Sequence, residues 1–386
     1  MNSAFIYDAV RTPRGKAKVD GGLAHLSPQE LVKQLVDALK ARLGEIASRP
    51  DALLLGCVGQ LGAQGGHIAL VSKLHSALPD ATAAHTINNY CASGLSAIGQ
   101  AAARISGGQD QVILAGGVEM MSQVPFMGDQ ASYYTDSSLP RRARYIPVVL
   151  AADRLANAEG IGRAEMDAAA LASQRKAAAA DDDRLFQKSR IPTGNLTGEE
   201  CIRPKTSATG LAALPASFGG LQAQYAEALG GKTFEPLHTV SHAPPICDGA
   251  GLALIGGKDV AAAPRARIIA FAECGGDPEA SLTAGLAAMD KVLLSAGLTL
   301  ADMDRIEFME AFAVTIAKFL RDYPVDQEKV NVSGGHIAKG HPMGASGAIL
   351  ASTLLDCLEQ SGGTLGLVVV TGASGVGAAM IVERLN

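Results

Sequence analysis

Asn89-Tyr-Cys-Ala-Ser-Gly94 begins a segment of this chain that recurs, in altered form, near residue 341. The first copy continues through a helix-like run of small residues and a Gly-Gly pair to the apolar run Val112-Ile-Leu-Ala-Gly116. The second copy begins with His341-Pro-Met-Gly-Ala-Ser-Gly347 and ends in Val368-Val-Val-Thr-Gly372. The step from Ser-Gly to Gly-Gly is 13 residues in one copy (94 to 107) and 15 in the other (347 to 362). The repeat predicts two related halves with a Cys and a His at equivalent helix starts.

The rest of the chain alternates between strand-like and helix-like segments. Ala4–Val10 is a short apolar strand candidate, and Ser27-Pro-Gln-Glu30 has the pattern of a capping box at a helix start. Of the 386 residues 48% are hydrophobic and only 4% aromatic, and 44 are glycines, which favours close packing of helices on sheet. Alternation of this kind is typical of a largely parallel sheet covered on both faces, so the sequence predicts an α/β fold.

The middle of the chain differs from the two halves in character. Residues 119–243 are richer in proline and in polar runs such as Arg141-Arg-Ala-Arg144, and we interpret them as an inserted loop domain. The first α/β half is then residues 1–118, completed by about 244–264. The second half is residues 265–386.

Composition excludes several classes of protein. A net charge of −5 and a pI near 5.9 indicate no nucleic-acid-binding surface. The six cysteines are scattered without a C-x-x-C pair, so we expect neither a disulfide framework nor a metal site. No stretch approaches the roughly 20 apolar residues of a membrane span, and the first strand meets charged residues too soon for a signal peptide. We therefore expect a cytoplasmic protein.

Cys91 and His341 are the residues in this pattern that carry chemistry. A thiol at a helix N-terminus lies near unpaired backbone N–H groups and the positive end of the helix dipole, which lower its pKa. His341 follows a glycine-punctuated loop, where it is placed to take a proton from a neighbouring thiol. A buried structural cysteine is the commoner fate of a free thiol. The duplicated position of His341 is what favours a catalytic pair.

Several ordered motifs resemble those of the thiolase family, and the resemblance extends over nearly the whole chain. They are Ala9-Val-Arg-Thr-Pro-Arg-Gly-Lys16, Asn89-Tyr-Cys-Ala-Ser-Gly94, Gly116-Gly-Val-Glu-Met-Met-Ser122 and Gly340-His-Pro-Met-Gly-Ala-Ser-Gly347. Within the family the chain is similar to bacterial 3-ketoacyl-CoA thiolases and acetyl-CoA acetyltransferases. The resemblance implies a duplicated five-layered α-β-α-β-α fold, in which the loop domain covers the coenzyme A site.

The resemblance also implies a reaction and its residues. Cys91 would be the nucleophile that becomes acylated, and His341 would activate it and line one oxyanion hole. The backbone N–H groups of Cys91 and Ala373 would line a second oxyanion hole. Acyl-CoA and CoA would be the substrates, with no tightly bound cofactor or metal and with a role in lipid metabolism. The family resemblance further implies a homodimer or homotetramer. The implied substrate-binding residues are Met121, Pro244, Phe312 and Gly375.

The resemblance breaks down at three positions of the implied site. Met309 stands where the family has the Asn of Asn-Glu-Ala-Phe, which positions a water in an oxyanion hole. Thr371 stands where the family has a second Cys, the acid/base that moves the substrate's α-proton. An unactivated hydroxyl is a far poorer base than a thiolate. Pro244 replaces a Ser that contacts pantetheine.

Two explanations of these changes remain open. One is a replacement acid/base, for which His336, Lys339 and His242 are the candidates. The other is an enzyme that keeps only acyl transfer, as a condensing acyltransferase with another acceptor, or a catalytically inactive partner subunit. Retention of both Cys91 and His341 in full motif context argues against the inactive subunit, because an inactive site needs neither.

Overall fold

The computed structural model describes residues 3–258, 260 and 263–385, and within this part of the chain ten strands form one mixed sheet. The strands are β1 (Phe5–Arg11), β2 (Gly15–Lys16), β3 (Ala52–Gly56), β4 (Ala83–Ile87), β5 (Val112–Met120), β6 (Cys247–Gly256), β7 (Ala266–Gly275), β8 (Arg305–Phe308), β9 (Leu365–Thr371) and β10 (Val376–Arg384). Their order across the sheet is β4-β3-β5-β6-β1-β7-β10-β9-β8, with β2 paired to β6.

This order shows that the two halves repeat one topology. From the middle outward, the first half runs β1-β6-β5-β3-β4 and the second runs β7-β10-β9-β8. The two halves meet where β1 and β7 pair, at Phe5–Arg267 and Ile6–Ala266. An isolated parallel bridge from Ile306 to Val330 takes the place that β4 has in the first half. The duplicated α/β fold expected from the sequence is therefore confirmed. The expected largely parallel sheet is wrong, because the central strands β1, β6, β7 and β10 pair antiparallel with all their neighbours and only β3–β4, β3–β5 and β8–β9 are parallel.

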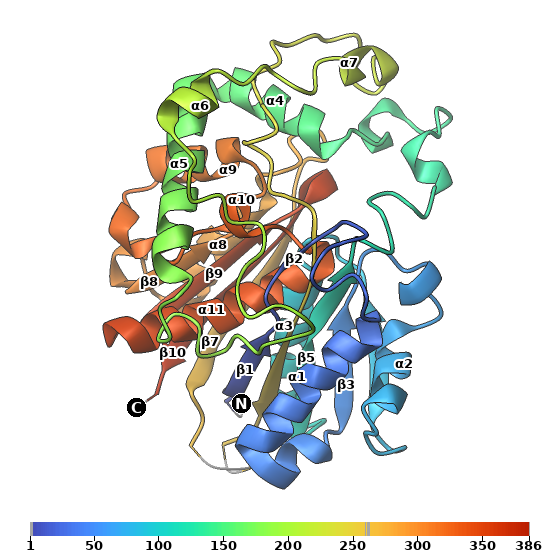
Figure 1. Cartoon of the computed structure of the whole chain (residues 1–386), viewed down its shortest axis with the longest axis vertical. Coiled ribbons are helices and arrows are strands. Elements are labelled where there is room, and N and C mark those ends of the chain that lie inside the picture. Colours follow the sequence, from blue (N-terminus) through green and yellow to red (C-terminus); the bar gives the residue numbers. More distant parts are fainter. Residues whose placement is uncertain (1–2, 259, 261–262, 386) are drawn as a thin grey trace.

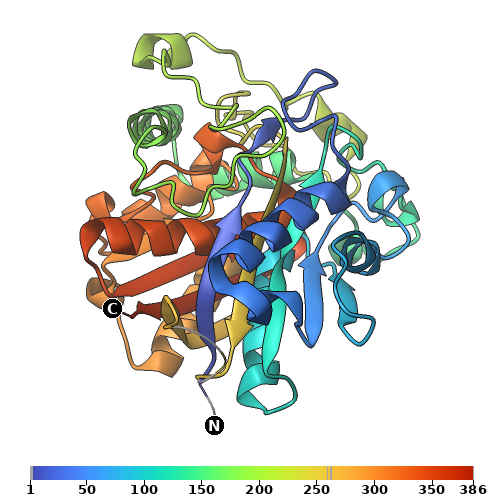
Figure 2. The same cartoon turned by 60° about the horizontal axis from the view of Figure 1, so that its bottom comes forward.

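The helices complete the layers around these strands (Figures 1 and 2). They are α1 (Pro28–Leu43), α2 (Ile68–His75), α3 (Ser93–Ser106), α4 (Val148–Glu159), α5 (Arg163–Ala180), α6 (Ala208–Ala212), α7 (Leu221–Gln224), α8 (Ala284–Ala296), α9 (Ala313–Asp322), α10 (His336–Lys339) and α11 (Ser346–Ser361). α3 and α11 pack on each other between the halves, where α3 also contacts β3 and β5 and α11 contacts β6, β8 and β9. α1 and α2 cover the outer face of the first half, and α8 covers β7 and β10 in the second.

The insertion lies between two strands that are directly paired. β5 and β6 run antiparallel from Val112–Gly256 to Met120–Asp248, so the chain leaves the sheet and returns to it at neighbouring points. Residues 121–246 between them contain α4 to α7. Figure 1 shows this segment, coloured green to yellow, over one end and one side of the sheet.

Helix α1 begins as the sequence predicts. The hydroxyl of Ser27 accepts the backbone N–H of Glu30 at 3.3 Å, and Pro28 occupies the first turn, where no N–H partner is needed. The reciprocal half of the predicted capping box is absent, because the Glu30 carboxylate instead accepts from Gln34 and pairs with His75. This contact ties the first turn of α1 to the last turn of α2.

Glycines let α3 and α11 approach each other closely. A Cβ atom at Gly94 would lie 2.7 Å from the carbonyl oxygen of Gly344, and one at Gly347 would lie 2.6 Å from the backbone nitrogen of Leu95. Neither spacing is tolerated by a side chain, so both positions require glycine. The contact brings together the two helix starts that carry the predicted nucleophile and base.

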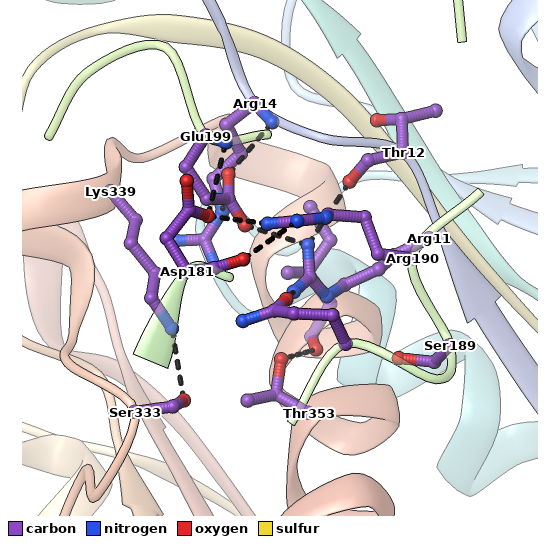
Figure 3. Close-up of polar contacts among 12 residues, drawn as sticks. Arg11, Thr12, Arg14, Asp181, Ser189, Arg190, Glu199, Ser333, Lys339 and Thr353 are labelled. Carbon is purple, nitrogen blue, oxygen red and sulfur yellow. Dashed lines mark hydrogen bonds and ion pairs between the residues drawn. The ribbon is translucent and has the colours of Figure 1, made fainter. Parts of the chain in front are cut away.

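A buried ion cluster fastens the insertion to β1 (Figure 3). The Glu199 carboxylate accepts from the Arg11 guanidinium at 2.7 Å and from the backbone N–H of Arg14 at 2.9 Å. Arg11 also donates to Gln187 at 2.6 Å. Burial alone would raise the pKa of Glu199, but Arg14 and Arg11 lower it to about 2. Glu199 is therefore an anion on which two buried cations depend.

Replacing Glu199 with Gln is expected to destabilise the fold by about 3–5 kcal/mol at neutral pH, because Arg11 and Arg14 lose their buried partner. The pKa of Glu199 is lowered on folding, so the native carboxylate stabilises the protein above its unfolded pKa of about 4.3. That contribution is lost as the pH falls toward about 2. The difference in the free energy of unfolding between the unmodified protein and Glu199→Gln should therefore decrease at low pH. Urea unfolding of both proteins at several pH values measures this difference.

Asp37→Asn provides the matched control, because its pair with Lys33 lies on the exposed face of α1. Such a surface pair contributes about 0.5 kcal/mol or less. Equal destabilisation by the two variants would show that the buried cluster does not hold the insertion in place.

Candidate active site

Cys91 stands in a tight turn between β4 and α3. The preceding residue, Tyr90, has a left-handed backbone with φ +45°, which is strained for a residue with a side chain. The hydroxyl of Ser93 stabilises the turn by accepting the N–H of Asn89 at 2.8 Å and donating to the carbonyl of Tyr90. The turn places Cys91 directly before Ala92, the N-cap of α3, with only 6% of its surface exposed.

His341 approaches Cys91 from the second half. Its Nε2 lies 3.1 Å from the Sγ of Cys91, and its Nδ1 lies 2.7 Å from the hydroxyl of Ser346. Its backbone N–H donates to the carbonyl of Pro245, and the Arg14 guanidinium donates to the carbonyl of Gly340 just before it. The predicted pair is therefore in contact, and Ser346 orients the ring by occupying its other nitrogen.

Burial keeps both members of this pair neutral in the free site. Burial raises the pKa of the Cys91 thiol to about 12, against the backbone N–H groups of Ala373 and of Cys91 itself, which lower it. Burial and the Arg14 charge lower the pKa of His341 to about 3. The lowered cysteine pKa expected from the helix start is wrong for the free site, because desolvation outweighs the N–H groups. A neutral His341 is ready to accept the thiol proton.

Glu119 anchors the turn that follows His341. Its buried carboxylate accepts backbone N–H groups of Val58 and Gly59 at 2.9 Å and of Gly344 at 3.0 Å, and the Gln64 side chain donates to it as well. One residue of β5 thus holds two segments from opposite halves. Glu119 lies inside a motif quoted above, but no pattern in the sequence assigned it this role.

A cavity of about 230 Å³ opens beside the pair. The residues that the sequence proposed and that line it with Cys91 and His341 are Met121, Pro244, Met309, Phe312, Thr371 and Ala373. Gly375 is not in the lining. It has φ +80° and its carbonyl accepts the N–H of Gly276 at 2.7 Å, so it shapes the turn behind Ala373.

Thr371 and Met309 occupy the positions where the family resemblance breaks down. Both line the cavity and both are buried. The Thr371 hydroxyl accepts the backbone N–H of Gly285 at 3.4 Å, and no ionisable group is bonded to it among the residues that the structure describes. A hydroxyl in this setting has no activated proton to exchange with substrate.

The three candidate replacement bases do not line this cavity. His242 is bonded through Nε2 to Asp167 at 2.7 Å, and the Lys339 ammonium donates to the Ser333 hydroxyl at 2.9 Å (Figure 3). His336 lies edge-on to His341 with 5.3 Å between ring centroids, and neither of its nitrogens has a hydrogen-bond partner among the described residues. Their role as acid/base stays a prediction.

Comparison with known proteins assigns this site to a family. Residues 4–224 match the family description "Thiolase, N-terminal domain", and residues 262–384 match "Thiolase, C-terminal domain". The chain belongs to the thiolase family. It is accordingly an acyltransferase that uses CoA thioesters as substrates, as its motifs implied.

Individual thiolases match over their full length. The 3-oxoadipyl-CoA/3-oxo-5,6-dehydrosuberyl-CoA thiolase of Escherichia coli is 33% identical, and the acetyl-CoA acetyltransferase of the same species is 36% identical, each with 100% of both chains covered. The crystal structure of human mitochondrial 3-ketoacyl-CoA thiolase matches with a TM-score of 0.87 at 28% identity, over 100% of this chain and 99% of that one.

Two kinds of feature are absent from the described residues. None of their helices has both the length and the apolarity that crossing a membrane requires. No three of their His, Cys, Asp or Glu side chains are grouped so as to hold a metal ion.

The neutral state of the pair predicts how Cys91 reacts with iodoacetamide. Because the pKa of the thiol is raised to about 12, its alkylation rate should climb steadily from about pH 5 to about pH 9 without a plateau. Peptide mass spectrometry of Cys91 measures the rate, with glutathione as the reference thiol. A plateau between about pH 5 and about pH 8 would reveal a thiolate–imidazolium pair and contradict the neutral state.

Proposed function

We propose that Cys91 accepts the acyl group of a CoA thioester and that His341 moves the proton. The observation that carries this proposal is the 3.1 Å contact between the Sγ of Cys91 and the Nε2 of His341 at an apolar cavity. The thiol gives its proton to Nε2 while Sγ attacks the carbonyl carbon. The bond to the leaving group then breaks, and His341 returns the proton to the departing CoA sulfur.

Backbone groups at the same point support charge stabilisation during the attack. The backbone N–H groups of Cys91 and Ala373 lie close enough to the Cys91 sulfur to lower the pKa of its thiol. They are therefore near the point where an oxyanion would develop during the attack. Ser374 has a left-handed backbone with φ +55°, and its N–H donates a hydrogen bond to the Ser281 hydroxyl. Both features fix the turn that contains Ala373. Donors fixed in this way need no rearrangement when the oxyanion forms.

The insertion supports entry of a long thioester substrate. The insertion contributes Val148, Val149 and Phe218 to the cavity wall, and the second half contributes Leu282 and Met309. The pantetheine arm would enter between these two walls, with the loop domain as its cover. Pro244 contributes an apolar edge where the family has a hydroxyl donor.

We further propose that acyl transfer to and from Cys91 is retained while carbon–carbon bond chemistry is slow. Cleavage of a 3-ketoacyl chain leaves a carbanion that must take a proton, and Thr371 has no activated proton to give. The other ionisable groups in the lining are committed elsewhere. Glu119 accepts backbone N–H groups, Asp129 accepts from Tyr134, and burial raises the pKa of each lining tyrosine. Transfer to an acceptor other than a carbanion is therefore the second candidate function.

Restoring the family residues tests this division. Met309→Asn combined with Thr371→Cys should raise CoA-dependent cleavage of 3-ketohexanoyl-CoA about a hundredfold, because a positioned acid/base contributes on that order. Exchange of labelled CoA into hexanoyl-CoA, which needs only acyl-Cys91, should proceed in the unmodified protein and vanish in Cys91→Ala. Both rates are measured by chromatography of the CoA esters.

Met309→Leu serves as the matched control, since it keeps the side chain apolar and of similar volume. If the unmodified protein cleaves as fast as it exchanges, and the double variant gains nothing, Thr371 is not the missing group. His336, Lys339 and His242 would then return as the acid/base candidates, and the proposed slow step would be withdrawn.

We propose that the chain works as a homo-oligomer in the cytoplasm. β4 is an edge strand of the sheet, so one row of its backbone groups has no sheet partner among the described residues. Beside it α2 exposes Leu70, Val71 and Leu74, the last at 60% of its surface. A second copy placed by a two-fold axis would pair the edges and cover these side chains. All six cysteines are free, which suits a reducing compartment.

Leu74→Glu should convert the oligomer to a smaller species, because the new charge would be buried at the edge-strand contact. Size-exclusion chromatography with light scattering reads the mass. Leu294→Glu is the control, since this leucine is 83% exposed on α8 at the opposite outer layer and should leave the mass unchanged. A monomeric unmodified protein would refute the proposed oligomer.

A further inference from the structure

Two cavities lie on either side of one pair of tyrosines. The first is the cavity of about 230 Å³ beside Cys91, and the second has about 360 Å³ and is formed largely by the insertion. Tyr134 and Tyr145 belong to the lining of both. Joining the two would more than double the space that is continuous with the nucleophile.

The two rings form a built partition. Their centroids are 4.9 Å apart with the planes tilted by 58°, and Tyr133 and Tyr225 lie edge-on to Tyr145 with centroids 5.8 and 6.4 Å from it. The Tyr134 hydroxyl donates to Asp129 at 3.1 Å. Tyr145 is only 4% exposed. Aromatic packing of this kind holds the rings in place and gives the wall a fixed position.

The partition faces the reacting sulfur through Tyr90. This residue immediately precedes Cys91, lines the first cavity, and lies close enough to Tyr133 and Asp129 for their charges to affect its pKa. An acyl group attached to Cys91 therefore extends within a cavity to which the partition contributes a wall. That conclusion rests on the proposed function, in which Cys91 carries the acyl group.

The lining of the first cavity also defines the chemistry of the acyl tail. Its acidic members are Glu119 and Asp129, and neither lysine nor arginine is among its described residues. A tail ending in a carboxylate would meet negative charge without a cation to pair with. Two relatives carry names that refer to such dicarboxylic acyl groups, 3-oxoadipyl-CoA and β-ketoadipyl-CoA. The cavity of this chain fits an uncharged apolar tail instead.

We infer that Tyr134 and Tyr145 set the substrate range of this enzyme by ending the acyl site. They confine it to uncharged apolar acyl groups that fit the first cavity and shut off the second. The second cavity is lined by the ion pair of Arg144 and Glu227, so it lies outside the acyl site while the partition stands.

The test is the ratio of kcat/KM for dodecanoyl-CoA to that for butanoyl-CoA, followed as acylation of Cys91 by intact-protein mass spectrometry. Tyr145→Ala and Tyr134→Ala should each raise this ratio about tenfold or more. A hydrophobic pocket that is too short by one or two methylenes lowers kcat/KM by about that factor. Tyr145→Phe keeps the ring and should keep the ratio. Of dodecanoyl-CoA, butanoyl-CoA and adipyl-CoA, adipyl-CoA should acylate the unmodified protein with the lowest kcat/KM.

Gln224→Ala is the control, because Gln224 lines the second cavity and not the first and makes none of the ring contacts of the partition. Its ratio should stay at that of the unmodified protein. If Tyr145→Ala does not fold, the more exposed Tyr134→Ala carries the test. The inference would be overturned if Tyr134→Ala or Tyr145→Ala folds and still has the same ratio of kcat/KM values as the unmodified protein. Failure of every CoA ester to acylate Cys91 in the unmodified protein would instead overturn the proposed function on which it rests.

Discussion

The contact between the N-terminal ends of α3 and α11 is the constraint on which the rest of the structure depends. Because Gly94 and Gly347 have no side chains, the helices meet backbone to backbone in the central layer. Only at that separation do Cys91 and His341, from opposite halves, come within 3.1 Å. The duplicated sheet order then follows as the scaffold that presents two equivalent helix starts to each other.

Much of this arrangement was predictable because the sequence repeats itself locally. The spacing of the two copies predicted that Cys91 and His341 stand at equivalent helix starts, and the polar middle predicted an insertion in that part of the chain. The partners of Glu119 and the position of Ser346 against the imidazole were not predictable, since they depend on segments brought together by folding. The pKa of Cys91 was predicted in the wrong direction, because a helix start is visible in sequence while the burial that outweighs it is collective.

In the proposed function, the burial that keeps the pair neutral also explains why the residue differences in the cavity lining would change the reaction. In an apolar site we expect each proton to be carried by a side chain that contacts the reacting atom. His341 meets that need at the sulfur of Cys91. Thr371 does not meet it at the substrate's α-carbon, because its hydroxyl is bonded to a backbone amide and has no ionisable neighbour. Acyl transfer and carbon–carbon bond chemistry are thereby separable in one pocket.

In our proposals, one part of the chain limits the substrate range and another part performs the chemistry. Cys91 and His341 stand on the duplicated core, where the glycine contacts allow almost no change. Tyr134 and Tyr145 stand on the insertion, which leaves and rejoins the sheet at one paired point of β5 and β6. Changes in the insertion therefore alter the wall of the acyl site without shifting the catalytic pair. Such a fold can change its acyl specificity and its reaction step independently.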